Sequence, residues 1–465
     1  MRRLVVLLAA TILLPSTALA HGRPAFMGDI AFHPENPDVV VVRATFGLVI
    51  SEDRGVTWRW ICAAVTGADP TRENPPILVT PDGAVLVGTF SGLARSTPER
   101  CEFERPAALD NRFVIDLNAS PTAPGTVWAV ATSGGSPDEI YRSIDQGRTF
   151  EQVGASIEDL LVERVRVAPS DASRVYLSGA VPTMVQRVPD GGLPDGGIPD
   201  GGLPMLPRRG YFLRSSDGGE TYTSIEMPLE DAERNVHLLA VDPTDADRVL
   251  VRMTRQLIDV GDERVVLTED GGDTWTTVAL ARQVSGGAFS SDGTRAWISS
   301  TDVDGLFRSD DGGRTFAQLQ RMNLPCLELL DDEPWVCVNQ FTDGFALGRV
   351  SDSMTIEETL RFDQIYDLVE CSSCTTVGHV CPMWFPDVAF DLRLDAGGAF
   401  DGGVSGSPRD AGATPSCTDM DAGGGSDGGP DEPGGGCGCH VTRPAGGAPW
   451  LIATVLALTL RRRFG

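Results

Sequence analysis

One eight-residue pattern, Ser/Thr-x-Asp-x-Gly-x-Thr-aromatic, recurs five times in this chain of 465 residues. Its copies begin at Ser51, Ser143, Ser215, Thr268 and Ser309. Five matches indicate an internal repeat. A single supersecondary unit cannot bury its apolar face alone, so a repeat chain must stack its units into a continuous core. The repeat therefore constrains the fold more than any other feature of the sequence.

Each copy of the pattern has the composition of a tight turn between two strands. The Asp carboxylate can accept hydrogen bonds from N–H groups of the turn, and Gly can adopt the positive φ that the turn needs. The Thr and the aromatic residue then begin the next strand. We therefore interpret five aspartates as structural and not catalytic: Asp53, Asp145, Asp217, Asp270 and Asp311.

A second element precedes the repeats, namely a strand, a Pro/Asp turn and a β-branched strand. Examples are residues 30–34 before 38–42 and residues 165–169 before 174–177. Each unit therefore reads as four short antiparallel strands. Two degenerate copies follow the same plan, and they begin near Gly92 and Gly348.

The number and length of the units predict the architecture. Repeats of about 40–50 residues with four strands each are typical of propeller blades. We therefore expect an all-β fold over residues 21–392, a seven-bladed β-propeller with four-stranded antiparallel blades. The alternative is six blades plus a Cys-rich capping subdomain, because residues 364–392 have no clear place in the series. The three Pro-Asp-Gly-Gly copies within 188–210 predict a disordered loop insertion there.

The repeated pattern resembles the Asp box of the BNR repeat family, which includes sialidases, sortilin-like receptors, xyloglucan-cleaving glycosidases and the photosystem II assembly-factor group. The resemblance implies that the boxes lie on the face away from a ligand. The loops between the second and third strands, and those between blades, would form the opposite face. The sialidase Phe/Tyr-Arg-Ile/Leu-Pro string is missing, and Gly22-Arg23-Pro24 is the nearest sequence. Sialidase activity is therefore disfavoured.

Acidic residues are frequent in the loops expected on the ligand face. Carboxylates there can bind Ca²⁺ or a cationic partner, or can supply the acid and base of glycoside cleavage. Solvated polar loops on an acidic protein are the plainer interpretation. We assign no cofactor, with Ca²⁺ as the alternative. The candidates are Asp138, Glu139, Asp259, Asp262, Asp302, Asp304 and Asp343.

Charge limits the partners of this chain. A formal net charge of −27 disfavours nucleic acid, because an acidic chain repels a phosphate backbone. A propeller is a scaffold, so its activity depends on a site and not on the fold. We predict a non-catalytic binding module for extracellular protein or polysaccharide. The alternative is a glycoside hydrolase that uses paired carboxylates.

The two ends of the chain carry features of targeting. Residues 1–20 have a basic start, an apolar stretch and Ala18-Leu19-Ala20, as in a signal peptide. A Gly/Asp-rich linker (393–436) leads to a tail (437–465) with Cys437, Cys439, an apolar segment and an Arg cluster.

This tail resembles the MYXO-CTERM sorting tail. The resemblance implies attachment through the C-terminal tail to the membrane, cleavage near the cysteines by a membrane-bound sorting protease and display on the outer cell surface. The alternative is an ordinary C-terminal membrane anchor with two incidental cysteines.

Ten cysteines in an exported chain predict disulfides. Cys326 and Cys337 can bridge adjacent strands, and Cys62 with Cys101 can join neighbouring repeats. The spacing of a further cluster also allows a tetrahedral zinc site, although we favour disulfides for it. That cluster contains Cys371, Cys374, His379 and Cys381.

Overall fold

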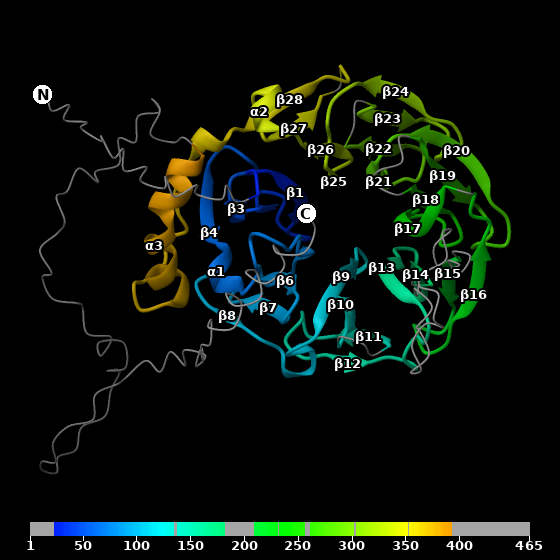
Figure 1. The fold of residues 1–465 in the computed structure, drawn as a ribbon, viewed down its shortest axis with the longest axis horizontal. Coiled ribbons are helices and arrows are strands. Elements are labelled where there is room, and N and C mark those ends of the chain that lie inside the picture. The colour runs from blue at the N-terminus through cyan, green and yellow to red at the C-terminus, as the bar shows by residue number, and fades with distance from the viewer. Residues whose placement is uncertain are drawn as a thin grey trace, which may run out of the picture. The chain divides into compact units, whose positions relative to one another are not determined.

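The structure is a computed structural model that describes residues 23–133, 137–181, 209–230, 232–255, 261–301, 304–351 and 353–392. Seven β-sheets are arranged in a ring about a central opening (Figure 1). The predicted seven-bladed propeller is confirmed. The predicted signal peptide, the linker, the sorting tail with Cys437 and Cys439, and almost all of the 188–210 insertion lie outside the described residues.

The strands of each blade are antiparallel neighbours in chain order. Blade 1 contains β1 (Met27–Phe32), β2 (Val40–Ala44), β3 (Gly47–Ser51) and β4 (Trp58–Cys62). Blade 2 contains β5 (Ile77–Val79), β6 (Val85–Thr89), β7 (Gly92–Ser96) and β8 (Phe103–Glu104). Blade 3 contains β9 (Phe113–Ser120), β10 (Ala123–Thr132), β11 (Asp138–Ser143) and β12 (Glu151–Gln152). Blade 4 contains β13 (Leu161–Ala168), β14 (Asp171–Ala180), β15 (Gly210–Ser215) and β16 (Thr223–Met227).

Three further blades complete the ring. Blade 5 contains β17 (Glu233–Val241), β18 (Val249–Arg255), β19 (Glu263–Thr268) and β20 (Thr276–Ala281). Blade 6 contains β21 (Val284–Phe289), β22 (Ala296–Ser300), β23 (Leu306–Ser309) and β24 (Ala317–Gln320). Blade 7 contains β25 (Cys326–Leu330), β26 (Glu333–Cys337), β27 (Leu347–Val350) and β28 (Ile356–Leu360). The short helices among the described residues are α1 (Ala63–Thr66), η1 (Ala107–Leu109), α2 (Gln340–Asp343) and η2 (Phe362–Gln364).

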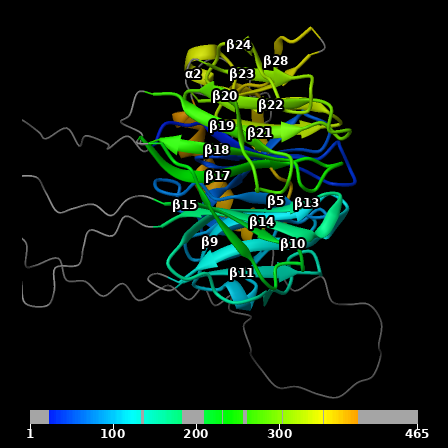
Figure 2. The same ribbon diagram turned by 90° about the vertical axis from the view of Figure 1, so that its right-hand side faces the viewer.

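The apolar cores lie between neighbouring blades. The middle strands are mostly apolar and are buried on both faces, because each sheet is covered by a sheet on either side. All five residues of β2 are buried, for example, and only Arg43 among them is charged. Trp58 of blade 1 and Trp335 of blade 7 belong to the same buried cluster. The stacking of blades therefore provides the continuous core that one repeat cannot form alone. Figure 2 shows the ring from its side, with strands running between its two faces.

The Asp boxes form the turns between the third and fourth strands, as predicted. In the blade 5 box, Asp270 accepts hydrogen bonds from the backbone N–H (2.9 Å) and the hydroxyl (2.6 Å) of Thr274. These bonds favour the carboxylate and hold the pKa of Asp270 near 2. The box residue Gly272 has a φ of 107°, and a Cβ there would lie 2.8 Å from Phe212 of the preceding blade. Glycine is therefore required by both the turn and the interface between blades.

The segment without a place in the repeat series closes the ring. Strand β29 (Ile365–Leu368) pairs in parallel with β4 and becomes a fifth strand of blade 1. Helix α3 (Thr376–Asp391), orange in Figure 1, packs outside β4. The propeller therefore has seven blades and, in addition, the C-terminal Cys-rich segment that the alternative had assigned to a cap.

Disulfides attach this segment to the start of the propeller. Cys62 bonds to Cys381 and Cys101 bonds to Cys371, so the expected Cys62–Cys101 bond is wrong. Proximity of repeats suggested that pairing, but the ring brings both cysteines beside α3 and its preceding loop instead. The predicted Cys326–Cys337 bond across β25 and β26 is confirmed.

The zinc alternative is also wrong. Cys371 and Cys381 are held in disulfides and Cys374 is disulfide-bonded too, so these thiols cannot serve as thiolate ligands. The three bonds with described partners are consistent with an extracellular or secreted protein. In the described part of the chain, no helix has the length and apolar character needed to cross a membrane.

Candidate ligand site in the central channel

A cavity of about 580 Å³ occupies the central channel and is lined by residues from all seven blades or the connections leading into them. Adjacent strands are antiparallel, so the loops between second and third strands and those between blades share one face of the ring. The Asp boxes and the turns between first and second strands lie at the other face. Arg43, at the end of β2, and Phe113, at the start of β9, both line the cavity. The cavity therefore opens on the face away from the boxes.

Four arginines line this cavity in an otherwise acidic protein: Arg43, Arg164, Arg166 and Arg252. Two of them are fixed by a buried carboxylate of β9. Asp116 accepts a hydrogen bond from Arg164 and another from Arg166, each at 2.7 Å, and a third from the N–H of Val165 at 2.9 Å. One carboxylate thus holds two guanidinium groups in place, and Glu163 on the same strand as these arginines is a second carboxylate that interacts with Arg164.

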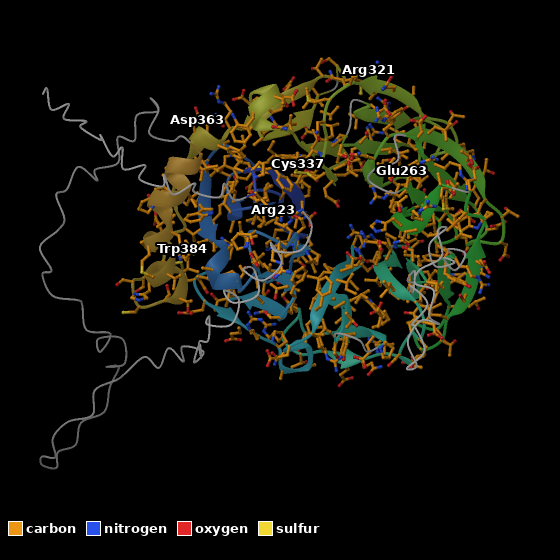
Figure 3. The ribbon with its side chains drawn as sticks, viewed as in Figure 1. Arg23, Glu263, Arg321, Cys337, Asp363 and Trp384 are labelled. Atoms are coloured by element: carbon orange, nitrogen blue, oxygen red, sulfur yellow. A yellow bond between two sulfur atoms is a disulfide. The ribbon has the colours of Figure 1, made fainter. Side chains whose placement is uncertain are left out.

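A second pair of cations meets at the entry to blade 2. Arg23 and Arg43 both donate to the side-chain oxygen of Asn74, at 2.7 and 3.1 Å. Burial lowers the pKa of Arg43, and nearby Arg23 and Arg164 lower it further while Asp29 opposes them. Among the described residues, neither Arg23 nor Arg43 has a carboxylate within salt-bridge distance. Figure 3 labels Arg23 beside the blue strands at the edge of the central opening.

A short polar chain crosses blades 4 and 5. The Nδ1 atom of His237 accepts from Arg252 at 3.1 Å, and its Nε2 hydrogen-bonds to Glu163. Arginine can only donate, so these partners assign the proton of His237 to Nε2 and make the ring neutral. Burial and the neighbouring arginines lower the pKa of His237 well below its usual range, and burial raises the pKa of Glu163. The lowered pKa of His237 and the raised pKa of Glu163 both disfavour a charged His237–Glu163 pair, in agreement with a neutral histidine.

Two more carboxyl groups lie on the innermost strands of adjacent blades, Asp29 on β1 and Glu328 on β25. Burial within the ring raises the pKa of Glu328 to about 7, and the charge of Asp29 raises it while Arg166 and Arg164 oppose. Burial also raises the pKa of Asp29. The Glu328 side chain is accessible from the channel and has no hydrogen-bond partner among the described residues. Its protonation can therefore change near neutral pH.

The channel mouth has an apolar side on blades 2 to 4. Phe113 and Leu161 line the cavity and are 37% and 51% exposed. Phe90, from the turn between β6 and β7, packs edge-to-face on Phe113 with ring centroids 4.7 Å apart. Exposed aromatic rings beside a charged cavity provide a surface for the apolar face of a ligand.

Of the predicted ligand-face residues that the structure describes, only Asp138 lines the cavity. Asp138 is 2% exposed and accepts a hydrogen bond from the N–H of Val162 at 2.6 Å, so it also holds blade 4 against blade 3. Burial raises its pKa. Its neighbour Glu139 pairs with Arg112 and accepts from the hydroxyl of Tyr141 at 2.9 Å.

The other predicted residues are distributed among different blades. Asp304 accepts from the N–H of Arg282 at 2.8 Å, and Asp262 and Asp343 are exposed. Asp259 and Asp302 lie outside the described residues. A role for these residues in ligand binding stays a prediction. Within the described ranges, no group of acidic, His and Cys side chains has the arrangement of a metal site.

Sequence reasoning missed the charged residues of the innermost strands, although the repeat contains a signal for them. Asp29 and Arg164 each precede the turn proline of their unit by five residues, and Glu163 and His237 precede it by six. Charged residues at these positions interrupt strands that are otherwise apolar. The innermost strand borders the channel, and adjacent residues on it, such as Glu163 and Arg164, both line the cavity.

Comparisons with known proteins agree with the fold. A family described as "Sortilin-Vps10: Sortilin, neurotensin receptor 3," matches residues 138–304. The structure of an ancestral GH74 enzyme is similar with a TM-score of 0.53 and 14% identity, over 72% of this chain. The match covers 46% of that enzyme, so this chain spans about half its length.

YCF48 from Cyanidioschyzon merolae matches at 14% identity over 67% of this chain and 92% of its own, with a TM-score of 0.42. No curated protein matches this sequence. The family match and the fold together support a BNR-type β-propeller, related in fold to sortilin and the GH74 proteins.

Proposed function

We propose that this protein is an exported, surface-anchored binding module that takes an extracellular chain into the channel mouth. One observation carries the proposal: a cavity of about 580 Å³ lined by residues from the seven blades or the connections leading into them, with arginines and carboxyl groups inside and exposed aromatic rings at the mouth. Pockets of about 300–1,000 Å³ typically bind small molecules or short chain segments. A polysaccharide chain or an extended peptide fits such a space, whereas a folded protein does not enter it.

Features outside the channel support export and anchoring. Residues 1–20 have the pattern of a signal peptide, and the C-terminal tail resembles a sorting signal. The disulfides agree with an oxidising compartment. In this proposal a membrane-bound sorting protease cuts near Cys437 and Cys439, and the linker holds the propeller at the outer cell surface.

The test is a binding survey with the full-length protein against immobilised neutral polysaccharides, acidic polysaccharides and extended peptides. We expect binding to at least one of these classes. Phe113→Ala should weaken it, because Phe113 lines the cavity. Val56→Ala, at an 80% exposed position of the blade 1 Asp box, serves as the matched control and should leave binding unchanged. Loss of binding by the Val56 variant with full binding by the Phe113 variant would reject the channel as the ligand site.

A glycoside hydrolase is the second candidate, and Glu328 and Asp29 favour it. A carboxyl group with a pKa of about 7 is protonated in about half of the molecules at neutral pH and can act as a general acid, while a second carboxylate acts as the base. The measurement is release of new reducing ends from a polysaccharide that the protein binds. Hydrolysis that is abolished by Glu328→Gln would establish the enzyme. Binding without any release of reducing ends supports the binding module.

A further inference from the structure

Two guanidinium groups at the channel mouth share one carboxylate neighbour, because Asp29 lies opposite Arg43 on the adjacent strand and interacts with it electrostatically. Arg23 and Arg43 converge on one neutral acceptor, the oxygen of Asn74. Arg23 also donates to the backbone carbonyl of Glu73 at 2.8 Å, which is neutral as well. These hydrogen bonds orient the two cations, and the single carboxylate of Asp29 offsets at most one of their two charges.

Arg43 is the better defined member of this pair. It is 6% exposed and lines the cavity, and its Nε atom has no hydrogen-bond partner among the described residues. A buried donor without a partner costs about 1–3 kcal/mol. Burying a cation costs free energy unless an opposite charge is near it. In the low-dielectric interior, an incoming anion would be stabilised by the N–H donors of the guanidinium and by its positive charge. Asp29 already supplies one negative charge, so the net attraction for an incoming anion comes from Arg43 and Arg23 together.

Apolar residues line the same cavity as Arg43. They include Pro76 at the entry to blade 2, Phe113 of blade 3 and Leu161 of blade 4. Phe113 is held by the edge-to-face contact with Phe90. The electron-rich face of an aromatic ring attracts the polarised C–H groups of a sugar ring. A ligand that carries an anion and an apolar ring face can use both features together.

We propose that Arg43 and Arg23 bind the carboxylate of a uronic acid unit in an acidic polysaccharide, while the sugar ring packs on Phe113. This proposal rests on the proposed function and names the ligand of the same channel. The planar guanidinium of arginine matches a carboxylate with two parallel hydrogen bonds.

The remainder of the lining favours a polysaccharide over an acidic peptide. Asp29 lies beside Arg43, and Glu163 and Glu328 are acceptors on other blades that line the same cavity. A uronic acid unit has a carboxylate for the arginines and several hydroxyl donors for these acceptors. An acidic peptide has additional carboxylates in place of hydroxyl groups, and these would meet the channel carboxylates with repulsion. The mixture of charges therefore fits a chain with sparse carboxylates and many hydroxyls.

The experiment compares matched probes on the full-length protein by calorimetric titration. The acidic probes are oligogalacturonate, alginate oligomers and hyaluronate oligomers, and the neutral match is fully methyl-esterified oligogalacturonate. A poly-aspartate peptide of equal charge tests the peptide alternative. We expect at least one acidic oligosaccharide to bind about tenfold or more tightly than the neutral ester, since one charged hydrogen-bond pair contributes roughly that factor.

Variants assign the effect to the cation pair. Arg43→Gln should reduce affinity for the acidic probe about tenfold and leave the ester unchanged, and Arg43→Lys should recover part of the loss. Arg23→Gln provides a second test at a less buried position, and Arg314→Gln on the blade 6 Asp box is the control. Thermal unfolding confirms that each variant is folded.

The outcomes separate the two proposals. Equal binding of acidic and esterified probes that depends on Phe113 would overturn the uronate site and leave the binding module standing. Tighter binding of poly-aspartate with the same dependence on Arg43 would replace the polysaccharide with a peptide. Binding of neutral chains alone would also overturn the uronate site, and no binding of any probe in the wider survey would overturn the binding module itself.

Discussion

The disulfides that close the ring should contribute more stability than the disulfide within one hairpin. The perturbation is the double variant Cys62→Ala/Cys381→Ala, which frees α3 from β4 and leaves Cys101–Cys371 intact. A disulfide stabilises mainly by restricting the unfolded chain, and the effect grows with the length of the loop that the bond closes.

The relevant loop is shorter than the 319 residues between Cys62 and Cys381, because the remaining bond already joins the two ends of the propeller. The chain runs 39 residues from Cys62 to Cys101 and 10 residues from Cys371 to Cys381, a loop of about 49 residues. The loop-entropy relation gives about 4 kcal/mol for this loop and about 3 kcal/mol for the 11-residue separation of Cys326 and Cys337. Removing the second ring-closing bond afterwards opens the full ring and should cost about 6 kcal/mol.

Urea unfolding of the full-length protein, followed by circular dichroism, measures these free energies of unfolding. Cys326→Ala/Cys337→Ala is the matched control, since it also removes one buried bond. We expect the ring-closing variant to lose more stability than the hairpin variant, and the loss from removing both ring-closing bonds to exceed the sum of the two separate losses. A smaller loss for the ring-closing variant, or simple additivity, would show that β29 and α3 hold the ring closed without help from the bonds.

Three further predictions follow from the boxes and the channel. Asp270→Ala should lower the free energy of unfolding by about 1–2 kcal/mol, because it removes the acceptor of both Thr274 donors in a solvated turn. Ligand binding in the channel should not change. Unchanged stability in chemical unfolding would contradict this prediction. The box hydrogen bonds lower the pKa values of Asp217, Asp270 and Asp311 from 3.8 to about 2. The stability that these carboxylates contribute is therefore present above about pH 4 and is lost as the pH falls through 2. A melting temperature that does not fall between pH 4 and pH 2 would contradict this prediction. Because the pKa of Glu328 is raised to about 7, its carboxyl group is mostly neutral at pH 6 and mostly charged at pH 8. An acidic ligand should therefore bind more tightly at pH 6, which calorimetry at both pH values tests. Glu328→Gln should remove the difference in affinity.

The local turn chemistry made the fold predictable. The Asp box fixes its own hydrogen bonds within eight residues, so the pattern alone locates the turn between third and fourth strands. The repeat spacing also located the degenerate units correctly: β7 begins at Gly92 and leads to β8 at Phe103. Residues 364–392 could not be placed in the repeat series because β29 pairs with a strand some 300 residues earlier, and repeat spacing carries no information about such a pairing.

The candidate site was less predictable, because it depends on where the ring directs side chains from separate blades. Asp259, Asp262 and Asp343 drew attention as acidic loop residues, whereas Arg43 and Arg164 lie in strands and look like ordinary polar positions in the sequence. Their meeting at one channel follows only from closure of all seven blades. Asp138 was identified for its loop, but the structure shows a carboxylate that also joins two blades.

The most direct test of the central claim is to block each face of the ring separately. Leu161→Cys places a thiol at the channel mouth, and Val56→Cys places one on the Asp-box face; the native side chains are 51% and 80% exposed. Each variant is labelled with a bulky maleimide and titrated with the polysaccharide that the unlabelled protein binds. We expect the label at residue 161 to abolish polysaccharide binding and the label at residue 56 to leave binding unchanged. Full binding with the channel mouth labelled, together with loss when the box face is labelled, would contradict the assignment of the channel as the ligand site.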